Sequence, residues 1–218
     1  MIKSVIFDLD GTLIDSMPVW YNVDRIFLAE NGHDYPPDVS EAVRKMRIEE
    51  SSVYFKDRFK LPHSQEYIIN RIEELVREQY EYKIPVKPYV NELLDFLDEK
   101  NIPYGIATST YKSLAVMVLT RLGIYDRFRF LMTCSEISSG KTEPLIYLKS
   151  AELLGTEPSQ TAVFEDSLHC IETASAAGFY TAAVYDESSA DEWDSIVKIS
   201  DISFMNLKNA SDIFQDGH

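Results

Sequence analysis

The feature that most restricts the fold is an alternation of helical and strand-like segments from about residue 86 to residue 207. Short apolar runs rich in β-branched and aromatic residues are typical of buried strands, and helical stretches with three- and four-residue apolar spacing separate them. The strand-like runs are 103–110, 127–134, 161–166, 180–186 and a short one within 199–207. Strands that alternate with helices pair in parallel through right-handed crossovers, which predicts an open sheet with helices on both faces.

The N-terminal part of the chain predicts one more strand and then a purely helical block. The apolar run SVIF ends in two aspartates, Asp8 and Asp10, and no comparable strand follows up to about residue 82. That stretch instead shows helical patterns at 18–32, 40–46, 49–59 and 64–82, and Pro85 and Pro88 mark the return to alternation. We therefore expect a small helical bundle inserted after the first strand.

Composition disfavours two classes of partner. Of the 218 residues, 36 are Asp or Glu and 21 are Lys or Arg, so the formal net charge is −15. This charge disfavours binding to nucleic acids and to anionic membranes, since both require a positive face. The two cysteines have no metal-ligand spacing and no apolar segment approaches a membrane span, so we expect a cytoplasmic protein with reduced thiols. We expect it to be a monomer or a weak dimer.

Polar residues gather where the predicted strands end, which is where parallel sheets bind ligands. Carboxylates follow the first strand and the strand at 161–166, hydroxyls follow the strand at 103–110, and a lysine lies in the loop after 127–134. These residues are Asp8, Asp10, Thr108, Ser109, Thr110, Lys141, Glu165 and Asp166. Taken singly, each resembles a turn or a helix cap; their joint placement at successive strand ends carries the inference.

This collection of side chains favours phosphoryl chemistry assisted by a metal ion. Several carboxylates within a few ångströms cannot all stay ionised unless a cation joins them. Oxygen ligands without His or Cys favour Mg²⁺. One carboxylate can act as a nucleophile and another as a general acid and base, while a lysine, a hydroxyl and backbone N–H groups hold the phosphoryl oxygens.

Four sequence motifs resemble those of the haloacid dehalogenase superfamily, in the branch of phosphatases and β-phosphoglucomutases. DLDGT is similar to the first motif, IATST to the second, the loop around Lys141 to the third and VFEDS to the fourth. The resemblance covers nearly the whole chain. It implies an α/β fold with a Rossmann-like, doubly wound parallel sheet core in residues 1–15 and 86–218, and an inserted helical-bundle cap domain in residues 16–85.

The same resemblance implies a role for each motif residue. Asp8 is expected to be the nucleophile and a metal ligand, and Asp10 the acid/base, with its backbone carbonyl on the metal. Asp166 is expected to bind the Mg²⁺ directly, and Glu165 directly or through water. Thr108, Ser109 and Lys141 are expected to bind the phosphate. The implied activity is a Mg²⁺-dependent phosphatase that hydrolyses a small phosphorylated metabolite, a sugar phosphate or nucleotide monophosphate, through an aspartyl-phosphate intermediate.

Departures from the family pattern help to distinguish a phosphatase from an isomerase and from a non-catalytic module. The third motif reads KTEPL, without the usual proline and aspartate at Thr142 and Leu145. Sugar phosphomutases carry a histidine at the position of Trp20 and an arginine near Glu49, so their absence favours hydrolysis over a β-phosphoglucomutase-like isomerisation. A non-catalytic module of the same fold is the alternative from a different class, although no motif residue is lost.

Three basic residues in the cap, Arg44, Lys45 and Arg47, admit two interpretations. They form either a solvated helix end or a group that reaches the non-reacting part of the substrate. A phosphonatase activity, which requires a lysine in the cap, is a further alternative. Lys45 is a candidate for that lysine, although no sequence feature singles it out. The sequence does not identify the substrate.

Overall fold

The structure is a computed structural model that describes residues 1–43, 46 and 48–214. Arg44, Lys45 and Arg47 therefore lie outside the described residues. The chain divides into two compact units: Met1–Asp15 together with Pro85–His218, here called the core unit, and Ser16–Ile84, here called the helical unit. Within the described residues, no helix combines the length and the apolar composition that a membrane crossing requires.

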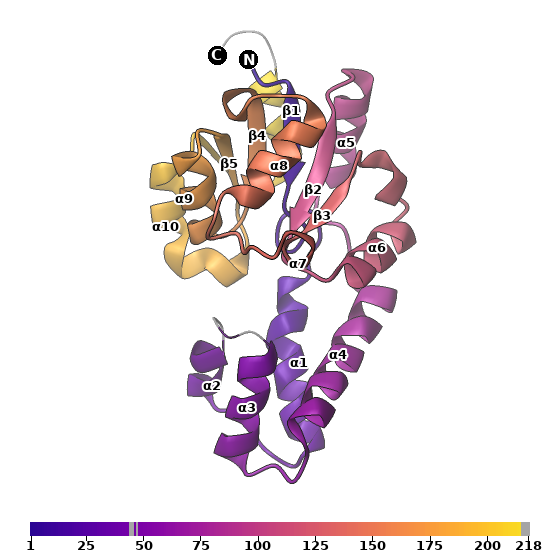
Figure 1. The fold of residues 1–218 in the computed structure, drawn as a ribbon, viewed down its shortest axis with the longest axis vertical. Coiled ribbons are helices and arrows are strands. Elements are labelled where there is room, and N and C mark those ends of the chain that lie inside the picture. Colours follow the sequence, from indigo (N-terminus) through magenta and orange to yellow (C-terminus); the bar gives the residue numbers. More distant parts are fainter. Residues whose placement is uncertain (44–45, 47, 215–218) are drawn as a thin grey trace. The chain divides into compact units, whose positions relative to one another are not determined.

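A single six-stranded sheet, all of whose pairings are parallel, organises the described part of the core unit (Figure 1). The strand order is β3-β2-β1-β4-β5-β6, so the chain moves outward in one direction from β1 and then returns to build the other half. The strands are β1 (Ser4–Phe7), β2 (Tyr104–Thr108), β3 (Leu131–Thr133), β4 (Thr161–Glu165), β5 (Tyr180–Val184) and β6 (Ile202–Phe204).

Helices connect these strands and cover the sheet. The α-helices are α5 (Val90–Glu99), α6 (Lys112–Arg121), α7 (Cys134–Ile137), α8 (Leu145–Leu154), α9 (Leu168–Ala176) and α10 (Trp193–Ile199). The 3₁₀ helices are η1 (Tyr125–Arg127), η2 (Pro158–Gln160), η3 (Glu187–Glu192) and η4 (Leu207–Phe214). The central strands β1 and β4 are buried throughout, and their apolar side chains face both sides of the sheet.

Successive residues of β1 show the two faces. Ile6 belongs to an apolar cluster with Ile146 and Tyr147 of α8 and Val163 of β4. The next residue, Phe7, points to the opposite face, where its ring contacts the rings of Tyr104, Phe128 and Phe164. The strand order places β1 between β2 and β4, so its carboxyl end is flanked by the ends of these two strands.

The helical unit contains α1 (Met17–Glu30), α2 (Pro37–Val43), α3 (Ile48–Phe59) and α4 (Gln65–Tyr82). Its core is formed by apolar side chains at helical spacing, and the rings of Phe27 and Phe55 lie 6.0 Å apart between their centroids. Ser64 caps α4, since its hydroxyl accepts a hydrogen bond from the N–H of Tyr67.

The expected fold class, an α/β core with a doubly wound parallel sheet and an inserted helical bundle, is confirmed. The short helices α7 and α10 were not expected, because four and seven residues are too few to show an apolar period. A capping box explains α7: the Thr133 hydroxyl accepts from the N–H of Glu136, whose carboxylate accepts from the N–H of Thr133.

Asp24 of α1 is an acidic group whose pKa is raised by burial. Burial raises the pKa of its carboxyl group to about 7, and none of the described residues donates a hydrogen bond to it. Because the pKa is raised in the folded state, folding favours the protonated form. The unfolding free energy is therefore highest below the unfolded pKa of about 4 and decreases as the pH rises toward 7.

We predict that Asp24→Asn stabilises the protein at pH 8 by about 1 kcal/mol or more, with a smaller effect near pH 4, since an amide carries no charge to desolvate. Urea unfolding of both proteins at each pH measures the difference. Asp15→Asn, at an exposed residue with no comparable burial, is the control. An equal effect of Asp24→Asn at both pH values would contradict this account of the charge.

Candidate active site

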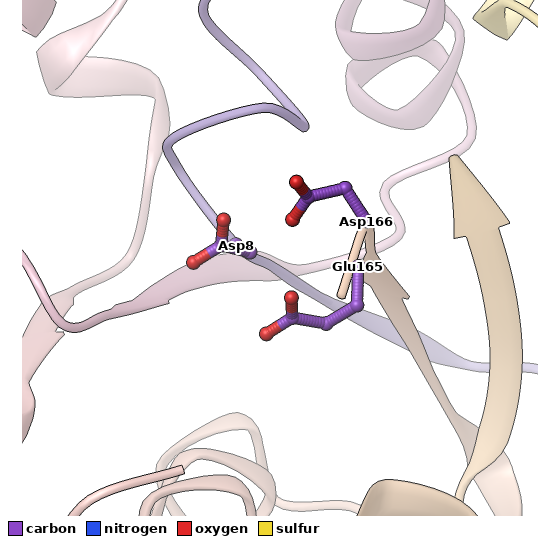
Figure 2. Close-up of side chains that lie close together, drawn as sticks. All are labelled: Asp8, Glu165 and Asp166. Atoms are coloured by element: carbon purple, nitrogen blue, oxygen red, sulfur yellow. The ribbon is translucent and has the colours of Figure 1, made fainter. Parts of the chain in front are cut away.

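Three acidic side chains meet at the carboxyl edge of the sheet. Asp8 directly follows β1, Glu165 ends β4, and Asp166 follows it. Phe7 and Phe164 are partners in the parallel register, so the residues after them are brought side by side. One carboxylate oxygen from each residue lies within 4.8 Å of the others, and all three side chains are buried. Figure 2 shows the carboxyl groups of Glu165 and Asp166 on the side that faces Asp8.

Lys141 supplies a positive charge to this cluster. Its ammonium group forms ion pairs with Asp8 Oδ1 and, at 2.7 Å, with Glu165 Oε1. The side chains of Lys141 and Glu165 are 4% and 1% exposed, so water screens these contacts little. The hydroxyl of Tyr147 on α8 donates a second hydrogen bond to Glu165 Oε1 at 2.8 Å. The lysine therefore holds two carboxylates that would otherwise repel each other.

One lysine does not neutralise the whole cluster. Burial, followed by the charge of Glu165, raises the pKa of Asp8 well above its usual range. The same two causes raise the pKa of Asp166 to about 8. Burial opposes the charge of Lys141, yet Asp8 and Glu165 raise its pKa well above the usual value. Burial therefore disfavours the ionised forms of Asp8 and Asp166, which indicates that the cluster can accept a further cation.

Asp10 belongs to a tight turn after β1. Gly11 has a left-handed φ of +85°, a conformation that favours glycine, and its N–H donates to the carbonyl of Ile14 at 2.9 Å. The side chain of Asp10 does not join the acidic cluster, since its Oδ2 accepts a hydrogen bond from the Thr110 hydroxyl at 2.6 Å. Asp10 is thus held between the ends of β1 and β2.

Thr108 and Ser109 lie at the end of β2, next to β1 in the sheet. The Thr108 hydroxyl is buried and accepts from the N–H of Thr110 at 3.0 Å, whereas the Ser109 hydroxyl lies 3.5 Å from Cys134 Sγ. The structure therefore brings Asp8, Lys141, Glu165 and Asp166 into direct contact or close proximity. It places the two hydroxyls on a neighbouring strand end, without a hydrogen bond to the cluster in the described residues.

Two residues that contact the site have no role assigned to them from sequence: Thr110, which is named there only as a strand-end hydroxyl, and Tyr147, which is not named. Thr110 follows β2, where a hydroxyl before a helix is typical of a cap. Tyr147 lies on the apolar face of α8, where the sequence pattern indicates only core packing. A buried tyrosine hydroxyl needs a partner, and this was the one signal available for Tyr147.

The donor set fits a small hard cation. The cluster of Asp8, Glu165 and Asp166 offers carboxylate oxygens and neither a thiolate nor an imidazole. Mg²⁺ prefers such ligands and commonly uses one or two carboxylates together with water and substrate oxygens. The raised pKa values of Asp8 and Asp166 agree, because a divalent cation would take the place of their protons.

Comparison with known proteins identifies relatives over most of the chain. Residues 5–184 match the profile of the haloacid dehalogenase-like hydrolase family. The chain is 29% identical to the phosphorylated carbohydrates phosphatase of Thermotoga maritima, over 81% of this chain and 82% of that protein. It is 30% identical to the N-acetylmuramic acid 6-phosphate phosphatase of Pseudomonas aeruginosa, over 84% of this chain and 81% of that protein.

The fold is also similar to solved structures. One from Thermotoga maritima superposes with a TM-score of 0.84 at 25% identity and covers 98% of both chains. That coverage includes the helical unit as well as the sheet, which agrees with the expected family.

We predict that Lys141→Met lowers the unfolding free energy of the metal-free protein by about 3–5 kcal/mol, because it leaves Asp8 and Glu165 buried without their cation. Urea unfolding in the presence of a chelator measures the change. Lys149→Met, which removes an exposed lysine of α8, is the matched control and should change stability by less than about 0.5 kcal/mol. Equal stabilities of the two variants would show that the ion pairs of Lys141 do not hold the cluster.

Proposed function

The chain belongs to the haloacid dehalogenase-like hydrolase family and is a phosphoric monoester hydrolase, and from this premise we propose that it removes the phosphate from phosphorylated carbohydrates in a Mg²⁺-dependent reaction. The observation that supports this most directly is the buried cluster of Asp8, Glu165 and Asp166 with Lys141. The named relatives act on phosphorylated carbohydrates and on N-acetylmuramic acid 6-phosphate, which suggests the substrate class.

Asp8 is proposed as the nucleophile. A carboxylate oxygen of Asp8 attacks phosphorus, the bond between phosphorus and the sugar oxygen breaks, and an aspartyl-phosphate forms. The contact with Lys141 places a positive charge where the phosphoryl oxygens and the attacking carboxylate concentrate negative charge. Thr108 and Ser109, at the end of the neighbouring strand, would bind the remaining phosphoryl oxygens.

Asp10 is proposed as the acid and base. It gives a proton to the departing sugar oxygen and later takes one from the water that attacks the aspartyl-phosphate, which releases inorganic phosphate and restores Asp8. The hydrogen bond from Thr110 holds the Asp10 carboxyl group at the edge of the site. Thr110 is therefore a positioning residue in this scheme.

Asp8 and Asp166 would hold Mg²⁺ directly, together with the backbone carbonyl of Asp10. Glu165 would assist directly or through water, since one of its oxygens already accepts from Lys141 and Tyr147. When bound, the cation would neutralise the acidic cluster and stabilise negative charge on the phosphoryl group.

The proposed function is tested by incubating the purified full-length protein with a panel of sugar phosphates, sugar alcohol phosphates and nucleotide monophosphates. We expect release of inorganic phosphate from one or more sugar phosphates with Mg²⁺, and loss of this activity with a chelator. Conversion of hexose 1-phosphate into 6-phosphate without net phosphate release would instead support the isomerase alternative. Absence of any turnover with every substrate and with a generic aryl phosphate would support the non-catalytic alternative.

We predict that Asp8→Asn lowers phosphate release by at least about 1,000-fold while the protein stays folded, because an amide cannot form the acyl phosphate. Initial rates with the best panel substrate and a thermal unfolding curve measure the two quantities. Asp15→Asn, seven residues further along at an exposed position, is the control and should keep full activity. Substantial turnover by Asp8→Asn would exclude Asp8 as the nucleophile.

A further inference from the structure

Lys87 is a largely buried cation that lies outside the acidic cluster. Its ammonium group donates three hydrogen bonds: to the carbonyl of Gly11 at 2.5 Å, to the carbonyl of Tyr185 at 2.9 Å and to Asp186 Oδ2 at 2.8 Å. An ammonium group has three N–H donors, so all of them are used. The Lys87 and Asp186 side chains are 14% and 6% exposed.

The three acceptors come from two separate loops. Gly11 lies in the turn after β1, whereas Tyr185 and Asp186 follow β5. In the sheet, β4 separates β1 from β5. The contacts of Lys87 therefore join two loops across the carboxyl end of β4, where Glu165 and Asp166 are located.

Both ends of the Lys87 side chain are fixed. At the backbone, the N–H of Lys87 donates to the carbonyl of Leu13 at 2.9 Å, and Ile14 forms an antiparallel bridge with Val86. At the other end, Asp186 is itself oriented, because its Oδ1 accepts from the N–H of Ser188 at 2.9 Å at the start of η3. The ammonium group thus has little freedom to move relative to Gly11.

The turn that Lys87 holds carries Asp10. The carbonyl that accepts from Lys87 belongs to Gly11, the residue directly after Asp10, and Gly11 has the left-handed φ that the turn requires. The turn is closed by the hydrogen bond from the N–H of Gly11 to the carbonyl of Ile14. The hydrogen bond from Lys87 to the carbonyl of Gly11 connects the turn to the residues around it. A change in this contact would therefore shift the backbone and the carboxyl group of Asp10.

We propose that Lys87 is a positioning residue of the catalytic centre, which fixes the Asp10–Gly11 turn after β1 against the loop after β5 so that Asp10 keeps its place between the ends of β1 and β2. The proposal rests on the proposed function, because it concerns the acid/base and the carbonyl that would ligate Mg²⁺. Lys87 lies outside the four sequence motifs, between Pro85 and Pro88.

A simpler role for Lys87 would be to balance the buried charge of Asp186. The two roles differ in what happens when both charges are removed together. If Lys87 only balances charge, a neutral pair restores everything that the loss of Lys87 disturbs. If Lys87 positions the turn, the neutral pair restores stability but not the geometry of Asp10, since the hydrogen bond to the Gly11 carbonyl is still missing.

The experiment compares Lys87→Met, Asp186→Asn and the double variant in the full-length protein. Hydrolysis of a generic aryl phosphate gives kcat and KM, titration calorimetry gives the dissociation constant for Mg²⁺ alone, and urea unfolding gives stability. We expect Lys87→Met to lose stability, at least about tenfold in kcat and at least about fivefold in Mg²⁺ affinity. The double variant should recover the stability and keep both functional defects, with KM changed less than kcat.

Arg127→Met is the matched control. Arg127 is a 22%-exposed cation of the core unit that pairs with Asp98 at 2.6 Å. The hydroxyl of Tyr104, the first residue of β2, contacts the same aspartate, which places this pair at the opposite edge of the sheet. Loss of Arg127 should lower stability and leave kcat and Mg²⁺ affinity within about twofold of the wild-type values.

A double variant with Mg²⁺ affinity and kcat within about twofold of the wild type overturns the proposal, and so does a double variant that does not fold. Mg²⁺ affinity also separates this proposal from the proposed function. If the wild-type protein hydrolyses no phosphate ester, the proposed function fails. A loss of Mg²⁺ affinity confined to the Lys87 variants would still show that Lys87 positions the Asp10–Gly11 turn.

Discussion

Repulsion among buried carboxylates at one edge of the sheet is the constraint on which the rest of the site depends. Asp8, Glu165 and Asp166 are brought together by the parallel pairing of β1 with β4, and burial removes the water that would screen them. Lys141 offsets part of this charge through its contacts with Asp8 and Glu165. Burial, together with the charge of Glu165, raises the pKa values of Asp8 and Asp166, and the proposed cation and phosphoryl chemistry follow from this imbalance.

Two buried or largely buried lysines lie around the carboxyl end of β4. Lys141 lies within the acidic cluster, whereas Lys87 pairs with Asp186 and contacts the turn after β1. Both lysines are among the groups that oppose the raised pKa of Asp166. These two lysines hold the carboxylates close together before any ligand binds. Ligand binding therefore does not have to bring the carboxylates together.

Much of this organisation could be predicted from sequence, because strand period, helix spacing and strand-end residues are local signals. The alternation after residue 86 predicts the parallel sheet, and Asp8, Lys141, Glu165 and Asp166 are recognisable at its strand ends. Lys87 and Tyr147 could not be assigned in this way. A lysine between two prolines reads as solvated, and its partners are 76 and 99 residues away in the chain. Such contacts depend on the order of strands in the sheet, which sequence period does not specify.

The most direct test is to find where a divalent cation binds. Mn²⁺ accepts the same oxygen ligands as Mg²⁺ and can be located by anomalous diffraction from a crystal grown with it. Our account predicts one strong site bonded to carboxylate oxygens of Asp8 and Asp166, beside the Asp10 carbonyl. A fully occupied cation elsewhere, with Asp8 still bound only to Lys141, would contradict it.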